Sequence, residues 1–93
     1  MRFLGYTEVA SFMAQHPLHG EALGAWLCEI QYHDWRSPEA LSADFRGVEV
    51  TQPFTVFRLG IRPLLIETIV DFRNQIVLLT GIRVAGESAA LIN

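Results

Sequence analysis

The chain has 93 residues, of which 51% are hydrophobic and 18% charged, a balance typical of a folded domain rather than a disordered segment. Its net charge of −3 argues against a general nucleic-acid binder, and its one cysteine excludes an internal disulfide. No apolar run reaches the ~20 residues of a membrane-spanning helix, and the N-terminal stretch lacks the apolar core of a signal peptide. We therefore expect one cytoplasmic domain over residues 1–93.

The first part of the chain favours a short strand followed by two helices. The opening residues MRFL suit a strand, and Thr7 is a candidate N-cap for a helix that the His16-Pro17 pair ends. The next helical run carries apolar residues at the i, i+3, i+4 and i+7 spacing of one buried face: Leu23, Trp26, Leu27 and Ile30. Cys28 lies in this run and is expected to be a small buried hydrophobe.

The stretch HDWRSPEALSADF, residues 33–45, joins the helical part of the chain to a part with sheet periodicity. Ser37 is placed to cap a short third helix that has Pro38 in its first turn, and Gly47 is placed to close it. Trp35 precedes this helix. We interpret it as a wedge that packs between the second and third helices.

From Val48 onward the pattern alternates, which predicts strands near residues 54–60, 64–72 and 75–85. Connections over 60–63 and 73–75 then set the pairing of these strands. One face of the resulting sheet is apolar and is expected to pack against the helices: Phe57, Leu59, Leu64, Ile66, Val70, Phe72, Ile76, Leu78, Ile82 and Val84. The sequence thus predicts an α+β fold in which a mostly antiparallel sheet of about four strands packs against two or three N-terminal helices.

The opposite face of this sheet mixes charged and apolar residues: Arg58, Leu65, Glu67, Asp71, Leu79, Gly81 and Arg83. The predicted register places Arg58, Leu65 and Arg83 in one row, with Glu67 two residues along its strand. A solvated ion-pair network is the ordinary interpretation of such charges. The functional alternative is a site in which two guanidinium groups stabilise a charged transition state while Glu67 exchanges a proton.

Several familiar catalytic motifs are missing from the sequence. It has no phosphate-binding loop, no dinucleotide-binding glycine motif, no HExxH and no serine in a nucleophile elbow. Its histidines, His16, His19 and His33, all lie in the helical part, and no cysteine or carboxylate pattern makes them metal ligands. We therefore predict no metal and no cofactor, and acid–base chemistry on the sheet would depend on Glu67.

Three strings resemble the HigB-type toxins of the RelE superfamily: SFMAQHP (11–17), ALGAWLCEIQYHDWRSPEALSADF (22–45) and TVF (55–57). The matching pattern is an aromatic residue before His-Pro, an Ala-Trp helix, an acid-Trp-basic element before Ser-Pro, and Ala-Asp-Phe. The chain departs from the family at two places. The family's Tyr-Arg pair falls on Leu64 and Leu65, and its Gly-Thr-His falls on Gly81, Ile82 and Arg83.

The resemblance implies a RelE-like fold and the toxin of a bacterial toxin–antitoxin pair, which inhibits translation by cleaving messenger RNA on the ribosome. The catalytic residues would be Arg58, Glu67 and Arg83. Other arginines would contact RNA phosphates: Arg36, Arg46, Arg62 and Arg73. The implied partners are messenger RNA, the ribosome and an antitoxin with a helix-turn-helix domain, so that DNA is bound only through the complex. The departures motivate an alternative, a toxin-like domain that binds an antitoxin or the ribosome without cleaving RNA.

Overall fold

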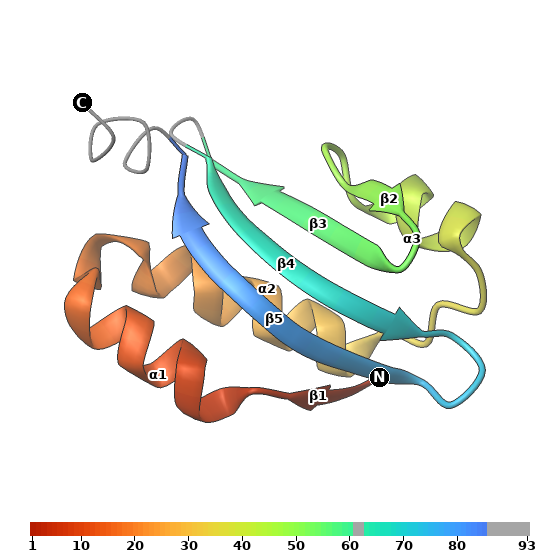
Figure 1. Ribbon diagram of the computed structural model, residues 1–93, viewed down its shortest axis with the longest axis horizontal. Helices are drawn as coiled ribbons and strands as arrows, with labels where there is room; N and C mark the ends of the chain where they lie inside the picture. Colours follow the sequence, from red (N-terminus) through yellow and green to blue (C-terminus); the bar gives the residue numbers. More distant parts are fainter. Residues whose placement is uncertain (61–62, 86–93) are drawn as a thin grey trace.

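The computed structural model describes residues 1–60 and 63–85, which form three α-helices and a five-stranded mixed sheet (Figure 1). The elements in chain order are β1 (Arg2–Leu4), α1 (Tyr6–Gln15), α2 (Gly20–Tyr32), α3 (Pro38–Asp44), β2 (Glu49–Thr51), β3 (Phe54–Leu59), β4 (Leu64–Asp71) and β5 (Ile76–Val84). A 3₁₀ turn, Pro17–His19, joins α1 to α2. Within the two described ranges, no helix has the length and apolar character to cross a membrane.

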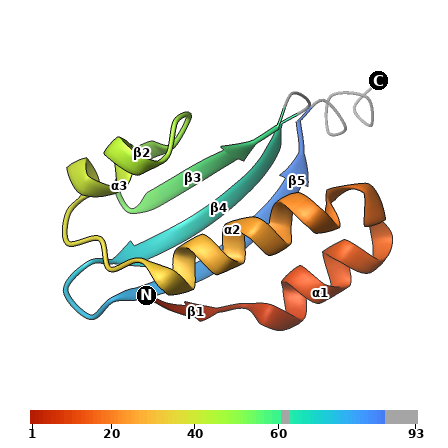
Figure 2. The ribbon, with the colours of Figure 1, turned by 180° about the vertical axis from the view of Figure 1, so that it is seen from behind.

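The strands lie in the order β1-β5-β4-β3-β2. β1 pairs parallel with the start of β5, and every other neighbouring pair is antiparallel, so the sheet is mostly antiparallel as expected. Figure 2 shows α1 and α2 lying across one face of the sheet, and Figure 1 shows the opposite face, which we call the outer face. The sequence did not predict β2, because three residues are too few to display an alternating pattern.

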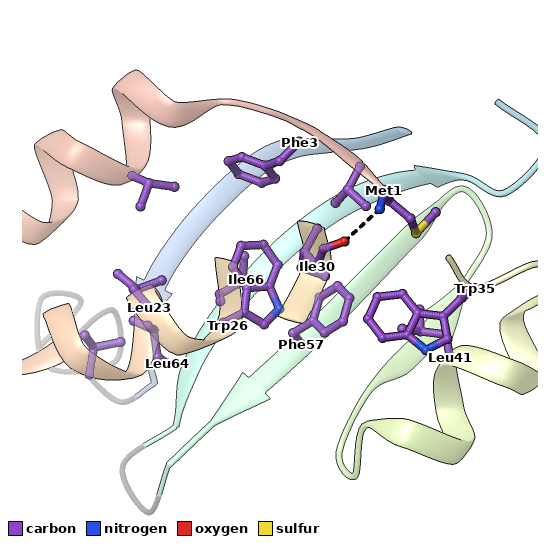
Figure 3. Packing of buried hydrophobic residues seen from close by; sticks show 13 residues of the cluster. Met1, Phe3, Leu23, Trp26, Ile30, Trp35, Leu41, Phe57, Leu64 and Ile66 are labelled. Carbon is purple, nitrogen blue, oxygen red and sulfur yellow. Dashed lines mark hydrogen bonds between the residues drawn. The ribbon is translucent and has the colours of Figure 1, made fainter. Parts of the chain in front are cut away.

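The core is built around Trp26 of α2, which lies between the helices and the sheet (Figure 3). Its ring packs edge-on against Phe3 of β1 at 5.5 Å and Phe57 of β3 at 5.3 Å. Leu23 and Ile30 are also fully buried, which confirms the predicted inner face of this helix. Burial of each such side chain contributes about 1.5–3 kcal/mol.

The cap of α1 differs from the sequence prediction. Gly5, not Thr7, is the N-cap, and its φ of 127° lies in the region that favours glycine. A Cβ at Gly5 would lie 2.7 Å from Cβ of Leu79, because the β1–α1 junction passes directly over β5. This close approach depends on three-dimensional packing and leaves no local signal in the sequence.

The third helix and the wedge follow the prediction more closely. Ser37 Oγ accepts a 3.2 Å hydrogen bond from the Ala40 N–H, and Pro38 is the first helical residue. The helix ends at Asp44, so Gly47 does not close it. Trp35 is 4% exposed and stacks on His33, the C-cap of α2, at 5.1 Å. Its position between the ends of α2 and α3 confirms the wedge.

The predicted register of β4 and β5 is right in one half and wrong in the other. From Leu64 to Glu67 the observed pairs, such as Leu64 with Val84, are those predicted. Nearer the turn, Val70 pairs with Val77 instead of Leu78, and a β-bulge between these halves gives β5 one extra residue. Such a residue switches which face the following side chains occupy.

Because of the bulge, the residues of β5 nearest the turn lie on the opposite face from the predicted one. Ile76 and Leu78 belong to the outer face, whereas Leu79 belongs to the helix side, in each case the reverse of the prediction. The exposed fractions agree, since Leu78 is 41% exposed and Val77 only 1%. The connection between the strands has four residues, 72–75, rather than three.

Candidate functional site

The outer face carries the predicted row of Arg58, Leu65 and Arg83 on three neighbouring strands. Adjacent strands lie about 4.8 Å apart, so the Cα atoms of the two arginines are about 10 Å apart. Both arginine side chains are exposed, and Leu65 between them is half-buried. Two long cationic side chains can therefore converge on one anion above Leu65.

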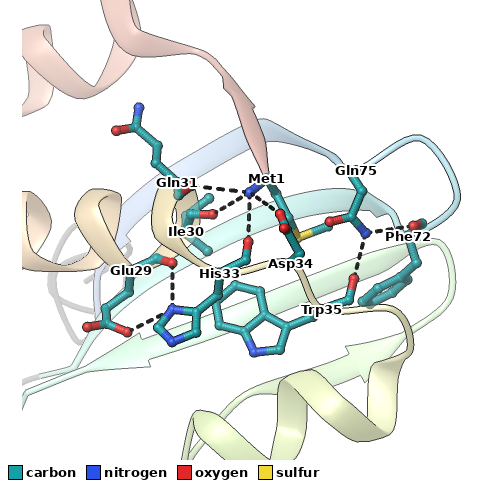
Figure 4. A network of polar contacts seen from close by, with 9 residues as sticks. All are labelled: Met1, Glu29, Ile30, Gln31, His33, Asp34, Trp35, Phe72 and Gln75. Carbon is teal, nitrogen blue, oxygen red and sulfur yellow. Dashed lines mark hydrogen bonds and ion pairs between the residues drawn. The ribbon is translucent and has the colours of Figure 1, made fainter.

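The two guanidinium groups form no ion pair with the described residues. Within residues 1–60 and 63–85, the ion pairs join the Met1 amino group to Asp34 and His33 to Glu29, both near the end of α2 (Figure 4). Neither Arg58 nor Arg83 has a carboxylate within 4 Å in this part of the chain. The solvated ion-pair network is therefore not observed among the described residues, none of which occupies the donors of these two arginines with a carboxylate.

Gly47 lies beside the stem of Arg58. A Cβ at Gly47 would lie 3.6 Å from Cβ and 3.9 Å from Cδ of Arg58, so the backbone between α3 and β2 runs along this side chain. The φ of Gly47 is 78°, a conformation that favours glycine. Of the predicted phosphate contacts among the described residues, Arg46, the exposed chain neighbour of Gly47, is the nearest to the row.

Glu67 lies two residues along β4 from Leu65, between Val56 of β3 and Gly81 of β5. Its Oε1 accepts a 2.9 Å hydrogen bond from the hydroxyl of Thr80. A Cβ at Gly81 would meet nothing within 4 Å, so there is open space beside the carboxylate. Thr80 was not among the predicted site residues, although a glycine inside a strand, here Gly81, is a known sign of a bulge.

Two of the remaining predicted phosphate contacts, Arg36 and Arg73, lie away from this row. Arg36 and Arg73 are exposed and flank the contact in which Gln75 Nε2 donates to the Trp35 carbonyl oxygen at 2.7 Å (Figure 4). This contact lies at the far end of β4, about 20 Å from Leu65. Arg62 lies outside the described residues.

The histidines and the cysteine lie with the helices. His16 stacks on Phe12 with ring centroids 4.3 Å apart, and His33 Nδ1 lies 3.3 Å from Oε2 of Glu29. Cys28 is exposed on α2, so the prediction that it is buried is wrong. In the described part of the chain, no three His, Cys, Asp or Glu side chains form a group that could hold a metal ion.

A hollow of about 590 Å³ lies on the other side of β5, between this strand and α1. Phe12 and Glu8 line it from the helix, and Thr80 and Gly81 line it from the strand. Thr80 therefore both lines this hollow and contacts the carboxylate of Glu67.

Comparison of the chain with protein-family models and with curated proteins finds no match.

Proposed function

We propose that this chain is the toxin of a bacterial toxin–antitoxin pair, with a RelE-like fold, and that it inhibits translation by cleaving messenger RNA on the ribosome. The observation that supports this most directly is the pair of arginines across Leu65, which have no carboxylate partner in residues 1–60 and 63–85, with Glu67 beside them. The resemblance of residues 11–17 and 22–45 to HigB-type toxins supports the same function.

The proposed reaction is attack of an RNA 2′-hydroxyl on the adjacent phosphorus. Glu67 accepts the proton of this hydroxyl while the O2′–P bond forms and the P–O5′ bond breaks; the 5′ oxygen takes a proton from water. Arg58 and Arg83 stabilise the charge that develops on the phosphoryl oxygens. Arginine stays protonated, so it does not replace Glu67 as the proton acceptor. The products are a 2′,3′-cyclic phosphate and a 5′-hydroxyl end.

The test is expression in a bacterium without the antitoxin, followed by mapping of new messenger RNA 5′ ends. We expect growth arrest and discrete new ends for the unaltered chain. Arg58→Ala with Arg83→Ala should abolish both effects, and Glu67→Gln should lower the cleavage rate by about 10²–10⁴-fold. Arg2→Ala is the matched control, because Arg2 is an exposed arginine at the opposite end of the sheet, paired with Ile76. A double arginine variant that stays fully toxic would contradict the site.

The second candidate is a toxin-like domain that binds an antitoxin or the ribosome without cleaving RNA. It is favoured by the apolar side chain of Leu65 between the arginines and by the placement of all three histidines with the helices. Normal growth without new 5′ ends, when the chain is shown to be folded, would favour this candidate. Co-sedimentation with ribosomes would then test whether it binds them.

A further inference from the structure

The bulge in β5 determines which residues of this strand belong to the outer face. Glu67 pairs with Gly81 and Thr68 with Leu79, so Thr80 is the extra residue between them. Side chains alternate between faces along a regular strand, in which Leu79, Gly81 and Arg83 would all share one face; the extra residue places Leu79 toward the helices while Gly81 and Arg83 remain on the outer face. Thr80 is therefore the residue at which β5 changes register, next to the strand pair of Glu67 and Gly81.

Thr80 also contacts the proposed proton acceptor. Its hydroxyl donates to Oε1 of Glu67 at 2.9 Å, which leaves Oε2 without a partner among the hydrogen bonds of the described residues. Beside this carboxylate, the absence of a side chain at Gly81 leaves open space on the outer face. One oxygen of Glu67 is thus held and the other is left for a reacting group.

From this geometry we infer that Thr80 is a positioning residue, whose hydroxyl holds Oε1 of Glu67 so that Oε2 accepts the proton of the attacking RNA hydroxyl above Gly81. This inference rests on the proposed function and assigns a role within it to a residue outside the row. Thr80 acts through Glu67, so its effect should disappear when Glu67 is no longer a base.

The activity test compares Thr80→Val, which keeps the branched shape without the hydroxyl, with Thr80→Ser, which keeps the hydroxyl. Thr80→Val should lower kcat about 10-fold with little change in KM, and Thr80→Ser should restore it. In a chain that already carries Glu67→Gln, Thr80→Val should have no further effect on kcat, because both changes impair the same proton transfer to Glu67. Equal activity of Thr80→Val and the unaltered chain, or additive losses in the double variant, would overturn the inference.

A second measurement separates this inference from the proposed function. The carboxyl ¹³C resonance of Glu67 should move in Thr80→Val and stay in place in Thr80→Ser, whether or not the chain cleaves RNA. If the unaltered chain does not cleave and the resonance behaves in this way, the positioning of Glu67 stands while the proposed reaction fails. A resonance that is the same in all three chains would overturn the positioning itself.

Discussion

The indole nitrogen of Trp35 donates a 2.6 Å hydrogen bond to Oδ2 of Asp44, the last residue of α3. The ring of Trp35 is buried between the ends of two helices, so this bond fixes the position of α3 relative to α2. We expect Asp44→Ala to lower the free energy of unfolding by about 1.5–3 kcal/mol, because the acceptor is charged and the donor is left unpaired.

Chemical denaturation checks this prediction. Glu39→Ala removes a carboxylate from the first turn of the same helix and should cost no more than about 1 kcal/mol. Trp35→Phe combined with Asp44→Ala should lower the free energy of unfolding by less than the sum of the two single changes, since both remove the same hydrogen bond. Strict additivity would mean that the bond does not contribute to stability.

Two glycines should respond in opposite directions to replacement by alanine. Gly5→Ala forces a side chain into a φ of 127° and to 2.7 Å from Cβ of Leu79, so we expect a loss of about 2 kcal/mol or more. Gly24 lies within α2, where a Cβ would meet nothing within 4 Å. Gly24→Ala should therefore raise stability by about 0.5–1 kcal/mol. Thermal unfolding of both variants measures the contrast, and a stabilising Gly5→Ala would show that the junction is not tight.

If the chain has the proposed function, Gly81 should be important for RNA cleavage rather than for folding. A Cβ there has open space around it, so Gly81→Ala should fold normally, whereas Gly81→Leu should fill the space beside Glu67. We expect Gly81→Leu to lower cleavage about 10-fold or more by displacing the reacting group. Circular dichroism of both variants controls for folding. Cleavage by Gly81→Leu at the normal rate would mean that the substrate does not occupy this space.

Asp71 should make stability depend on pH in the acidic range. The backbone N–H of Asn74 donates to Oδ1 at 3.0 Å and its side-chain amide to Oδ2 at 2.8 Å, and these bonds hold the pKa of Asp71 below its ordinary value of 3.8. A lowered pKa in the folded state contributes stability above the ordinary value, and this contribution disappears as the pH falls through the folded pKa. The stability difference between the unaltered chain and Asp71→Asn should therefore narrow below about pH 4.

Urea denaturation from neutral pH to about pH 2 measures this difference. Asn74→Ala removes the donor side chain and should weaken the same pH dependence. A difference that stays constant across this range would show that the turn does not depend on the charge of Asp71.

Much of the fold could be predicted because its signals are local. The buried face of α2 follows from the spacing of Leu23, Trp26 and Ile30, and the start of α3 follows from Ser37 and Pro38. The row of Arg58 and Arg83 was also predicted, because charged and apolar residues alternate where these strands pair.

The faces of the first four residues of β5 could not be predicted, because these residues carry no local signal that distinguishes the two faces. The residues Ile76, Val77, Leu78 and Leu79 are all apolar, so hydrophobicity does not show which of them face the helices. The contact between Thr80 and Glu67 depends on the bulge at the end of this run, and the sequence alone does not place the bulge.

The pairing of β1 with β5 has a consequence for the order in which the chain folds. Arg2 lies opposite Ile76, so two segments 74 positions apart must meet before the sheet gains its parallel edge. Contacts at such separation require a large loop to close, and they slow folding relative to helix formation. During synthesis, Phe3 and Trp26 can meet early, but β1 gains its neighbouring strand only after β5 has emerged from the ribosome. The row of Arg58 and Arg83 also requires β5, so the proposed toxin can act only after β5 has been translated.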